Sequence, residues 1–447
     1  MAVADTDPLR QRIVAVDVLR GLVLVVLLPD LAGGFSFYTM AEKYPDDWVW
    51  RVLAEQFKHV PWSGAAVWDL VMPLFVFLVG VSMSLSYHRR QAVGQGQSQM
   101  LGHALLRSVT LVVLGLLLQL NVERRIDELL PYLVLSGGLP IASWWHSATG
   151  RTGGPAKVSI GIAYCVFVLA CAIGWLGLHV SQLGDYQFGN QILVLMGLAY
   201  LPVFLMLRWS APVQTAAIAI LLSGYGALFI LYTPAGTITP SGEIFTGIFS
   251  HWNNGDNVAA AFDRWFLNLL PRKDPYVGNP HGYHTLQFVP LAAGMLVGAM
   301  VGRLLAEGGD VRRLALRLGA MALAGLGLAW LLTQTLFPLV KSLWTPSWAV
   351  FSTSICALLL ALLLHFFGLP QRSSLGGPLI ILGTNSMLLY VIAFTEHWRL
   401  ATLWQRIFGS EWVASLSWWP VAQSCLVLLT LWALAYVLFR LRVFVRV

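Results

Sequence analysis

Long apolar stretches alternate with short polar connections along the whole chain. Each stretch is about 20 residues long, the length that a helix needs to cross a bilayer. The pattern predicts an all-α fold: a polytopic transmembrane helical bundle of about 12 spans, in a single integral membrane domain over residues 1–447. The spans are expected at 18–38, 66–87, 104–122, 128–146, 158–179, 190–208, 212–232, 285–305, 314–337, 347–367, 377–395 and 418–440. Whether the fourth and fifth cross completely is open, because Gly137, Gly138 and Pro140 interrupt the fourth.

Composition supports a membrane protein. Apolar residues make up 57% and charged residues 11% of the chain, whereas a soluble globular protein has about a quarter charged residues. The net charge of +7 is typical of basic cytoplasmic loops, so the lipid bilayer rather than nucleic acid is the expected partner. The four cysteines all fall inside predicted spans and do not suggest a disulfide framework. Metal-ligand spacing is absent from the sequence, and no metal is predicted.

Basic residues set the expected orientation, because cytoplasmic loops carry an excess of Lys and Arg. One set of alternate loops holds most of them: Arg10, Arg12, Arg89, Arg90, Arg151, Lys157, Arg208, Arg303, Arg312, Arg313, Arg372, Arg440, Arg442 and Arg446. Both termini are therefore predicted in the cytoplasm, in a multi-pass protein of a bacterial inner membrane. Two long outer loops follow, at 39–65 and 233–284. Loops of this length are usually functional or disordered, and the aromatic content of these two argues against disorder.

One histidine stands where a membrane enzyme would keep a base. His59 precedes the apolar run Ala65–Ser86, and Asp69 lies within the first turns of that run. Histidine is the side chain whose unperturbed pKa lies nearest neutral pH. A carboxylate that orients a catalytic histidine is a recurrent arrangement. His59 and Asp69 are therefore the predicted catalytic residues, with a purely structural carboxylate as the alternative.

Ionisable residues within the first span suggest a second site. Asp17 and Arg20 are three residues apart and share one helix face, so they either form an anchoring ion pair or leave Arg20 to contact an anionic ligand. Asp30 is predicted deep in the membrane or near its outer edge, where charged groups usually mark a site or a paired contact. Asn385 lies in a polar patch, Gly383–Ser386, that could line a pocket.

The outer segments combine aromatic, amide and carboxylate side chains, a mixture that suits a carbohydrate. An interfacial aromatic belt with packed polar turns is the alternative. The substrate-binding candidates are Trp62, Asn253, Asn254, Asp263, His284 and His397.

Several motifs together resemble the membrane acyltransferase family of lysosomal heparan-α-glucosaminide N-acetyltransferase. The first is Val16-Asp17-Val18-Leu19-Arg20-Gly21, and the most specific is His59-x-x-Trp62-x-Gly64-x-x-x-x-Asp69-Leu70-x-x-Pro73-x-Phe75-x-Phe77-x-x-Gly80. The stretches Phe262–Trp265 and Lys341–Trp348, and Gly383–Ser386, follow in the right order. The resemblance implies acetyl-CoA as the acyl donor, used from the cytoplasmic side, and a sugar acceptor on the other side. It also implies that His59 is the catalytic histidine.

Two features depart from the family pattern. Asp30 stands where the family often has an asparagine after its first span, so a contact near the acyl group differs. Residues 123–186 look like an insertion that adds two spans to about ten family-like ones. An even number of added spans preserves the orientation of everything that follows.

The resulting hypothesis is a membrane-embedded acyltransferase that moves an acetyl or other acyl group from cytoplasmic acyl-CoA to an amino or hydroxyl sugar. His59 would act as general base, with an acyl-histidine route left open. The candidates for binding the donor are Arg20, Asp30, Arg89, Arg90, Arg303 and Asn385. A secondary transporter would predict internal repeats, which the sequence does not show. A non-catalytic partner in envelope polysaccharide export is the other alternative, and the oligomeric state, including a homodimer, is open.

The predicted orientation can be tested by cysteine labelling in intact cells. In a background lacking the four native cysteines, Ser250→Cys should react with a membrane-impermeant thiol reagent, because the 233–284 loop is predicted outside. Arg372→Cys, in a predicted inner loop, should react only after the cells are opened. The opposite pattern would invert the orientation and place His59 on the same side as cytoplasmic acyl-CoA.

Overall fold

The computed structural model of the protein describes residues 13–29, 35–119, 187–233, 243–270, 272, 274–367 and 376–444. Within these ranges the chain forms helices and no strand, which confirms the all-α prediction for the described part. The predicted insertion at 123–186, with the predicted spans 128–146 and 158–179, lies outside the described residues, as does Asp30.

The chain folds into two compact units, each assembled from separate stretches of sequence. Unit 1 comprises Met1–Leu78, Ala306–Leu328 and Val350–Arg446. Unit 2 comprises Val79–Leu305 and Ala329–Ala349, with Val447. A single domain over the whole chain stays a prediction.

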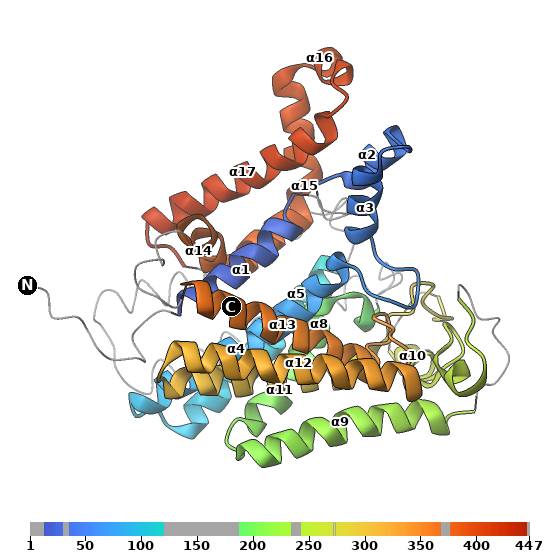
Figure 1. Cartoon of the computed structure of the whole chain (residues 1–447), viewed down its shortest axis with the longest axis vertical. Helices are drawn as coiled ribbons and strands as arrows, with labels where there is room; N and C mark the ends of the chain where they lie inside the picture. The colour runs from blue at the N-terminus through green and yellow to red at the C-terminus, as the bar shows by residue number, and fades with distance from the viewer. Residues whose placement is uncertain are drawn as a thin grey trace, which may run out of the picture. The chain divides into compact units, whose positions relative to one another are not determined.

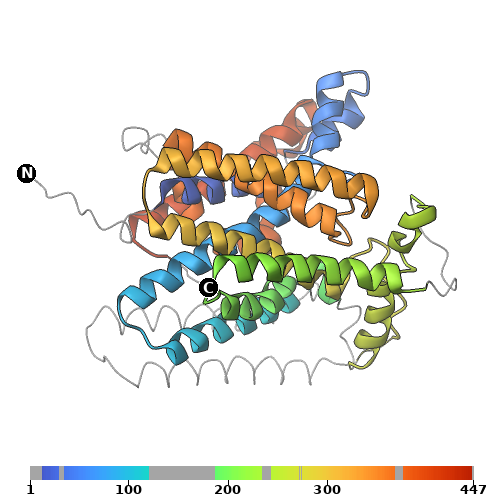
Figure 2. The same ribbon diagram turned by 60° about the horizontal axis from the view of Figure 1, so that its bottom comes forward.

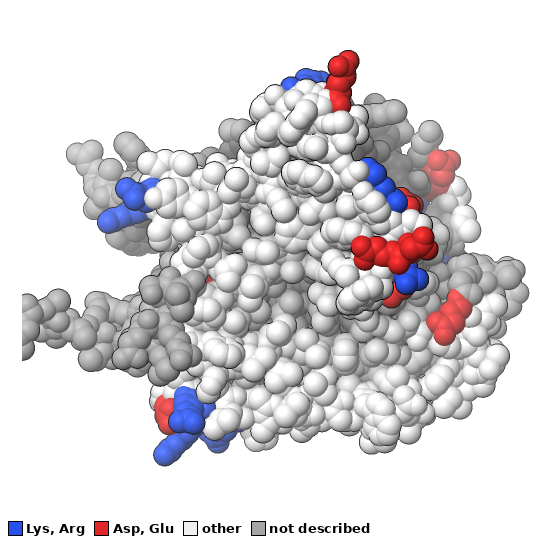
Figure 3. Space-filling model, turned by 45° about the horizontal axis from the view of Figure 1, so that its top comes forward, with Lys and Arg blue, Asp and Glu red and all other residues white. Residues whose placement is uncertain are grey.

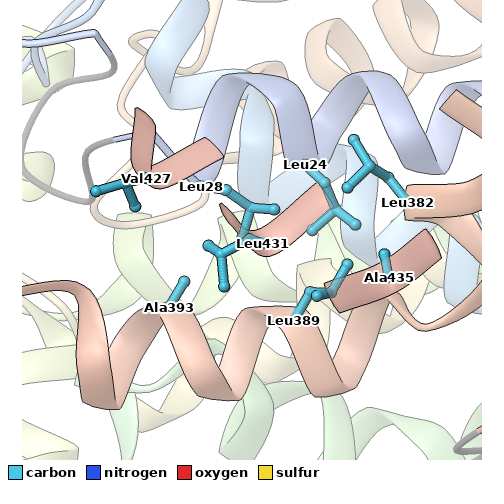
Figure 4. Close-up of a cluster of buried hydrophobic side chains, with 8 residues drawn as sticks. All are labelled: Leu24, Leu28, Leu382, Leu389, Ala393, Val427, Leu431 and Ala435. Atoms are coloured by element: carbon cyan, nitrogen blue, oxygen red, sulfur yellow. The ribbon is translucent and has the colours of Figure 1, made fainter. Parts of the chain in front are cut away.

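The core of unit 1 joins helices from the two ends of the chain. α1 (Val14–Leu27) packs against α14 (Gly377–Thr384), and α15 (Ser386–Phe408) and α17 (Trp419–Arg440) complete the group, as Figure 1 shows. Aliphatic side chains from this group are buried together in one cluster. Figure 4 shows its members: Leu24, Leu28, Leu382, Leu389, Ala393, Val427, Leu431 and Ala435.

Glycines allow α1 and α14 to approach closely. A methyl group on Gly21 would overlap the backbone carbonyl of Leu379, and one on Gly383 would overlap the carbonyl of Asp17. Small residues at helix contacts are typical of membrane bundles, where packing has to replace the hydrophobic driving force. This crossing therefore depends on the missing side chains at both positions.

The segment predicted as the outer loop 39–65 is largely helical. α2 (Phe37–Lys43) and α3 (Trp48–Gln56) pack against each other, and the Asp47 side chain caps α3 by accepting from the backbone N–H of Val49 at 2.9 Å. Lys43 donates to the backbone carbonyl of Ser417 at 3.3 Å, which ties α2 to the start of α17. The loop therefore has a defined structure before the chain reaches His59.

Unit 2 contains a tightly packed pair, α5 (Gln97–Gln119) and α8 (Ile192–Met206), which run side by side in Figure 2. The hydroxyl of Ser108 donates to the carbonyl of Gly197 at 2.6 Å, a hydrogen bond between the two helices. Further helices of this unit are α9 (Ala211–Leu231), α10 (Val258–Asn268) and α11 (Phe288–Glu307). The second predicted outer loop, 233–284, thus contains α10 as well as a short 3-10 helix, η3 (Gly247–Trp252).

The other elements are α4 (Val71–Ala92), α12 (Val311–Thr335), α13 (Pro346–Phe367), α16 (Ser410–Ser415), η1 (Val67–Leu70), η2 (Phe188–Asn190) and η4 (Thr285–Gln287).

Seven helices in the described ranges are long and apolar enough to cross a membrane: Val67–Ala92, Gln97–Leu116, Ala211–Leu231, Thr285–Glu307, Val311–Thr335, Pro346–Phe367 and Trp419–Arg440. Each coincides with a predicted span to within several residues. They indicate an integral membrane protein, and on the face shown in Figure 3 charged side chains form only a few separate groups.

The predicted number of about 12 spans is not confirmed, because several predicted spans differ from the structure. α1 has 14 residues and ends shortly before Pro29, since proline disfavours helical backbone at the preceding residue. α8 has 15 residues and is shorter than a span. The predicted span 377–395 is two helices, α14 and α15, bent by 75° at Asn385, and they add an eighth span only if counted as one.

Gly21→Ala should destabilise the protein, because the added methyl group would push α1 away from α14. Overpacking of this kind costs about 1–3 kcal/mol. Gly377→Ala on α14 is the matched control, since a methyl group there meets nothing within 4 Å. The midpoint of thermal unfolding in detergent should fall for Gly21→Ala alone, and equal midpoints would contradict the close approach.

Candidate active site

A histidine and an aspartate ten residues apart meet at the start of the second predicted span. Nδ1 of His59 lies 2.7 Å from Oδ1 of Asp69. Asp69 is held by η1, which runs directly into α4 and so gives the carboxylate a rigid support. An ionised carboxylate only accepts hydrogen bonds, so Nδ1–H is the donor and the lone pair of the neutral imidazole lies on Nε2.

The second carboxylate oxygen of Asp69 holds the backbone around the histidine. It accepts the N–H of Ala66 at 3.1 Å and the N–H of Val60 at 3.4 Å. Gly64 lies within the same segment with a φ of +115°, a conformation that side chains with a Cβ rarely adopt. One carboxylate therefore positions both the imidazole and the chain that carries it.

The two partners differ sharply in exposure. The Asp69 side chain is fully buried, whereas the His59 side chain is 47% exposed. The buried ring of Trp68 lies 6.3 Å from the imidazole, centroid to centroid. The pair therefore combines a fixed, water-excluded carboxylate with a base that a second molecule can approach.

Three basic side chains gather in unit 2 where α4 ends and α5 begins. Arg90 donates to the side-chain oxygen of Gln95 at 3.0 Å. Arg107 donates to the hydroxyl of Tyr200 at 3.4 Å, and its guanidinium lies 5.4 Å from the centre of that ring. Arg107 lies close enough to Arg90 to act on it electrostatically, and Arg90 acts in the same way on His103. In the part of the chain that the structure describes, none of the three bases pairs with a carboxylate.

The sequence indicated only part of this basic cluster. Arg89 and Arg90 were candidates, and Arg89 is exposed at the end of α4. His103 and Arg107 were missed because they stand at the edge of an apolar run that was assigned to a span. Their spacing of four residues, which places both on one face of α5, was the available signal.

A second histidine–aspartate pair lies within unit 2. Nδ1 of His284 is 3.3 Å from Oδ2 of Asp263 on α10, and both side chains are 1% exposed. The backbone N–H of Thr285 donates to the same oxygen at 3.0 Å. Both residues were sequence candidates for substrate binding, but not as a pair. Burial, and then the charge of Asp263, raise the pKa of the nearby Tyr276 hydroxyl, which therefore stays protonated.

The remaining donor-site candidates have partners within the chain. Arg20 forms the ion pair with Asp17 that the spacing allowed, at 2.8 Å. Asn385 is buried at the break between α14 and α15 and donates to a backbone carbonyl just beyond α17 at 3.1 Å. Arg303 donates to a backbone carbonyl at 3.1 Å. These contacts hold the fold, and a role in donor binding stays a prediction for all three.

The other candidates for binding the sugar acceptor also make contacts within the unit to which they belong. Trp62 is buried within the segment between His59 and Asp69. Asn253 and Asn254 bond to backbone groups in unit 2, and His397 in unit 1 lies 2.9 Å from the carbonyl oxygen of Pro29. No group of three His, Cys, Asp or Glu side chains that could hold a metal ion occurs in the described ranges.

The comparisons with known proteins give one relationship. A stretch of 107 residues is 32% identical to heparan-α-glucosaminide N-acetyltransferase of Mus musculus and 30% identical to the protein of that name of Homo sapiens. The match covers 24% of this chain and only 14% of each relative. No protein-family model matches the chain. The similarity supports a relationship to that family and, with it, a transferase.

Proposed function

We propose that the protein is a membrane-embedded acyltransferase that moves an acetyl or other acyl group from acyl-CoA to an amino or hydroxyl group of a sugar. The observation that carries the proposal is the half-exposed His59 imidazole bonded to the buried Asp69 carboxylate. The partial similarity to two N-acetyltransferases supports this reaction class. The donor is proposed to arrive from the cytoplasm of a bacterial cell and the acceptor from the other side, with both termini cytoplasmic.

In this mechanism His59 is the general base. Its Nδ1–H donates to Asp69, so Nε2 takes the proton from the acceptor O–H or N–H as that atom attacks the thioester carbonyl. The carbon–sulfur bond then breaks, and the leaving thiolate receives the proton from the imidazolium. The Asp69 carboxylate stabilises the imidazolium while the proton is held. A general base typically contributes about 10²–10⁴-fold to the rate.

A covalent route uses the same atom differently. Nε2 attacks the thioester, CoA leaves, and the acyl group passes from the imidazole to the acceptor in a second step. Ping-pong kinetics would identify this route, whereas a ternary complex would identify general-base catalysis. Both require the orientation that Asp69 provides.

The donor phosphates are proposed to bind the cluster of Arg90, His103 and Arg107. Guanidinium groups suit phosphate because they offer several N–H donors in a planar fork. Arg90 and Arg107 are like charges in a partly buried region where neither pairs with a carboxylate of the described chain, and a bound anion would relieve their repulsion. The cluster lies at the end of α4 and the start of α5, the helix ends that the positive-inside rule places at the cytoplasm.

His59→Ala should insert and fold normally but lose acyl transfer by about 100-fold or more. The measurement is release of CoA from acetyl-CoA with glucosamine as acceptor, in detergent. His281→Ala, which removes an exposed histidine elsewhere in the chain, is the control and should keep wild-type turnover. Retention of more than about a tenth of the turnover by His59→Ala would contradict the role of a base.

Asp69→Asn should fold but transfer acyl groups at least about tenfold more slowly, because the amide lacks the charge that stabilises the imidazolium. One amide oxygen also replaces the two oxygens that serve His59, Ala66 and Val60. The rate and its dependence on pH are compared with those of the wild type. Identical profiles would show that Asp69 has only a structural role.

Arg107→Gln should raise the KM for acetyl-CoA by about tenfold or more, since a charge-assisted hydrogen bond contributes about 1.5–3 kcal/mol. The turnover number at saturating donor should change much less. Arg317→Gln removes an exposed arginine from α12 and controls for the change in net charge. Equal KM values for both variants would exclude Arg107 from the donor site.

A further inference from the structure

The segment between α1 and His59 carries side chains that suit neither bulk water nor the hydrocarbon core of a bilayer. Between Phe37 and Lys58 seven residues are charged: Glu42, Lys43, Asp46, Asp47, Arg51, Glu55 and Lys58. Several aromatic or aliphatic side chains of the same segment are exposed: Tyr38, Tyr44, Trp48, Val49 and Val52. Trp and Tyr concentrate at the boundary between lipid and water, where one end of the ring is apolar and the other is wet. The composition of the segment therefore matches that boundary.

One side of α3 packs within unit 1. The Phe37 ring of α2 lies 6.2 Å from the ring of Trp50 and 5.0 Å from that of Phe57, centroid to centroid. Ala54, on the same side of α3 as Trp50, is buried. With nine residues the helix is about 14 Å long, whereas the hydrocarbon core of a bilayer is about 30 Å thick. α3 can therefore lie along a membrane surface but cannot cross the membrane.

The other side of α3 divides into an apolar flank and a charged flank. Trp48 and Val52 are four residues apart and so adjoin on the helix, with Val49 beside them. All three are exposed, and Trp48 is 67% exposed. Arg51 and Glu55 are exposed four residues apart on the neighbouring flank. An amphipathic helix of this kind lies in the plane of an interface, with its apolar flank at the boundary between headgroups and acyl chains.

α2, against which α3 packs, is attached to the start of a span. Ser36, directly before α2, shares a 2.8 Å hydrogen bond between hydroxyl groups with Ser424 in the second turn of α17. Lys43 at the end of α2 donates to the carbonyl of Ser417, two residues before α17 begins. α17 is long and apolar enough to cross a membrane, and the exposed Trp418 beside its first residue is typical of a membrane boundary. α2 therefore lies level with the end of a span.

α3 is attached to the start of a second span through the candidate active site. His59 is the third residue after α3, and its imidazole bonds to Asp69. Asp69 belongs to the first turn of the apolar segment Val67–Ala92, which is also long enough to cross a membrane. The predicted topology starts this span and α17 on the same side of the membrane. Attached at both ends, α2 and α3 then lie at that membrane surface.

We propose that α3 binds the lipid surface on that side, with Trp48, Val49 and Val52 at the boundary between headgroups and acyl chains and with Arg51 and Glu55 in the headgroup layer. The apolar flank consists of three side chains, whereas a stable protein interface takes about 20–30 residues from each partner. Lipid therefore fits the flank better than a second copy of the chain or another protein does. The lipid contact sets the depth of the segment that leads to the candidate active site, and it does not depend on acyl transfer there.

The test places single spin-labelled cysteines in the full-length protein, in a background lacking the four native cysteines. The protein is held at one chain per nanodisc of phosphatidylethanolamine and phosphatidylglycerol. Oxygen concentrates among acyl chains and a nickel chelate stays in water, so the ratio of their collision rates with the label reports its depth. Val52→Cys should give a ratio several-fold higher than Glu55→Cys. Leu429→Cys, exposed in the middle of α17, calibrates the acyl interior.

Val49→Cys and Arg51→Cys repeat the comparison on the two flanks and decide the test if a variant of the first pair does not fold. Low ratios on both flanks would overturn the proposal and leave α3 in water. Poor access of both reagents to the apolar flank would overturn it as well, because protein would then cover that flank. High ratios on both flanks would place α3 among the acyl chains and contradict a position at the surface.

Discussion

Polar groups that are removed from water inside a helical bundle must find hydrogen-bond partners within the chain, and this constraint shapes both units. Asp69 meets it by accepting from His59 and from the backbone of Ala66 and Val60. The same contacts that make its burial tolerable also fix the imidazole. In unit 1, stability and the geometry of the candidate active site therefore have one physical cause.

Elsewhere in unit 1, two helices pack closely because their contact positions lack side chains. Gly21 and Gly383 let the backbones of α1 and α14 come together, and the aliphatic cluster of unit 1 closes around that crossing. The break at Asn385 then turns α15 away by 75° from α14. Asn385, at this break, is buried, and its side-chain amide donates to the carbonyl of Val443.

The two histidine–aspartate pairs show how burial changes the use of one chemical arrangement. His59 and His284 both direct Nδ1 to a carboxylate, but the first is half-exposed and the second is sealed. An exposed imidazole can exchange a proton with an incoming substrate, which suits a general base. A sealed one lacks that access and is held in a fixed hydrogen-bond geometry by its carboxylate partner. The difference lies in the surroundings and not in the residues.

The sequence by itself determined the helical class and the position of seven apolar helices, and it singled out His59 and Asp69 as a candidate pair, because hydrophobic length and local motif spacing are readable along one chain. Only the tertiary structure decided which candidates meet. The Asp263–His284 pair and the cluster of Arg90, His103 and Arg107 join residues from different helices or segments. The bend at Asn385 also depended on packing, since a continuous apolar run looks the same whether the helix is straight or broken. Hydrophobicity records how much chain is apolar, whereas the contacts between separate segments decide what its polar residues can do.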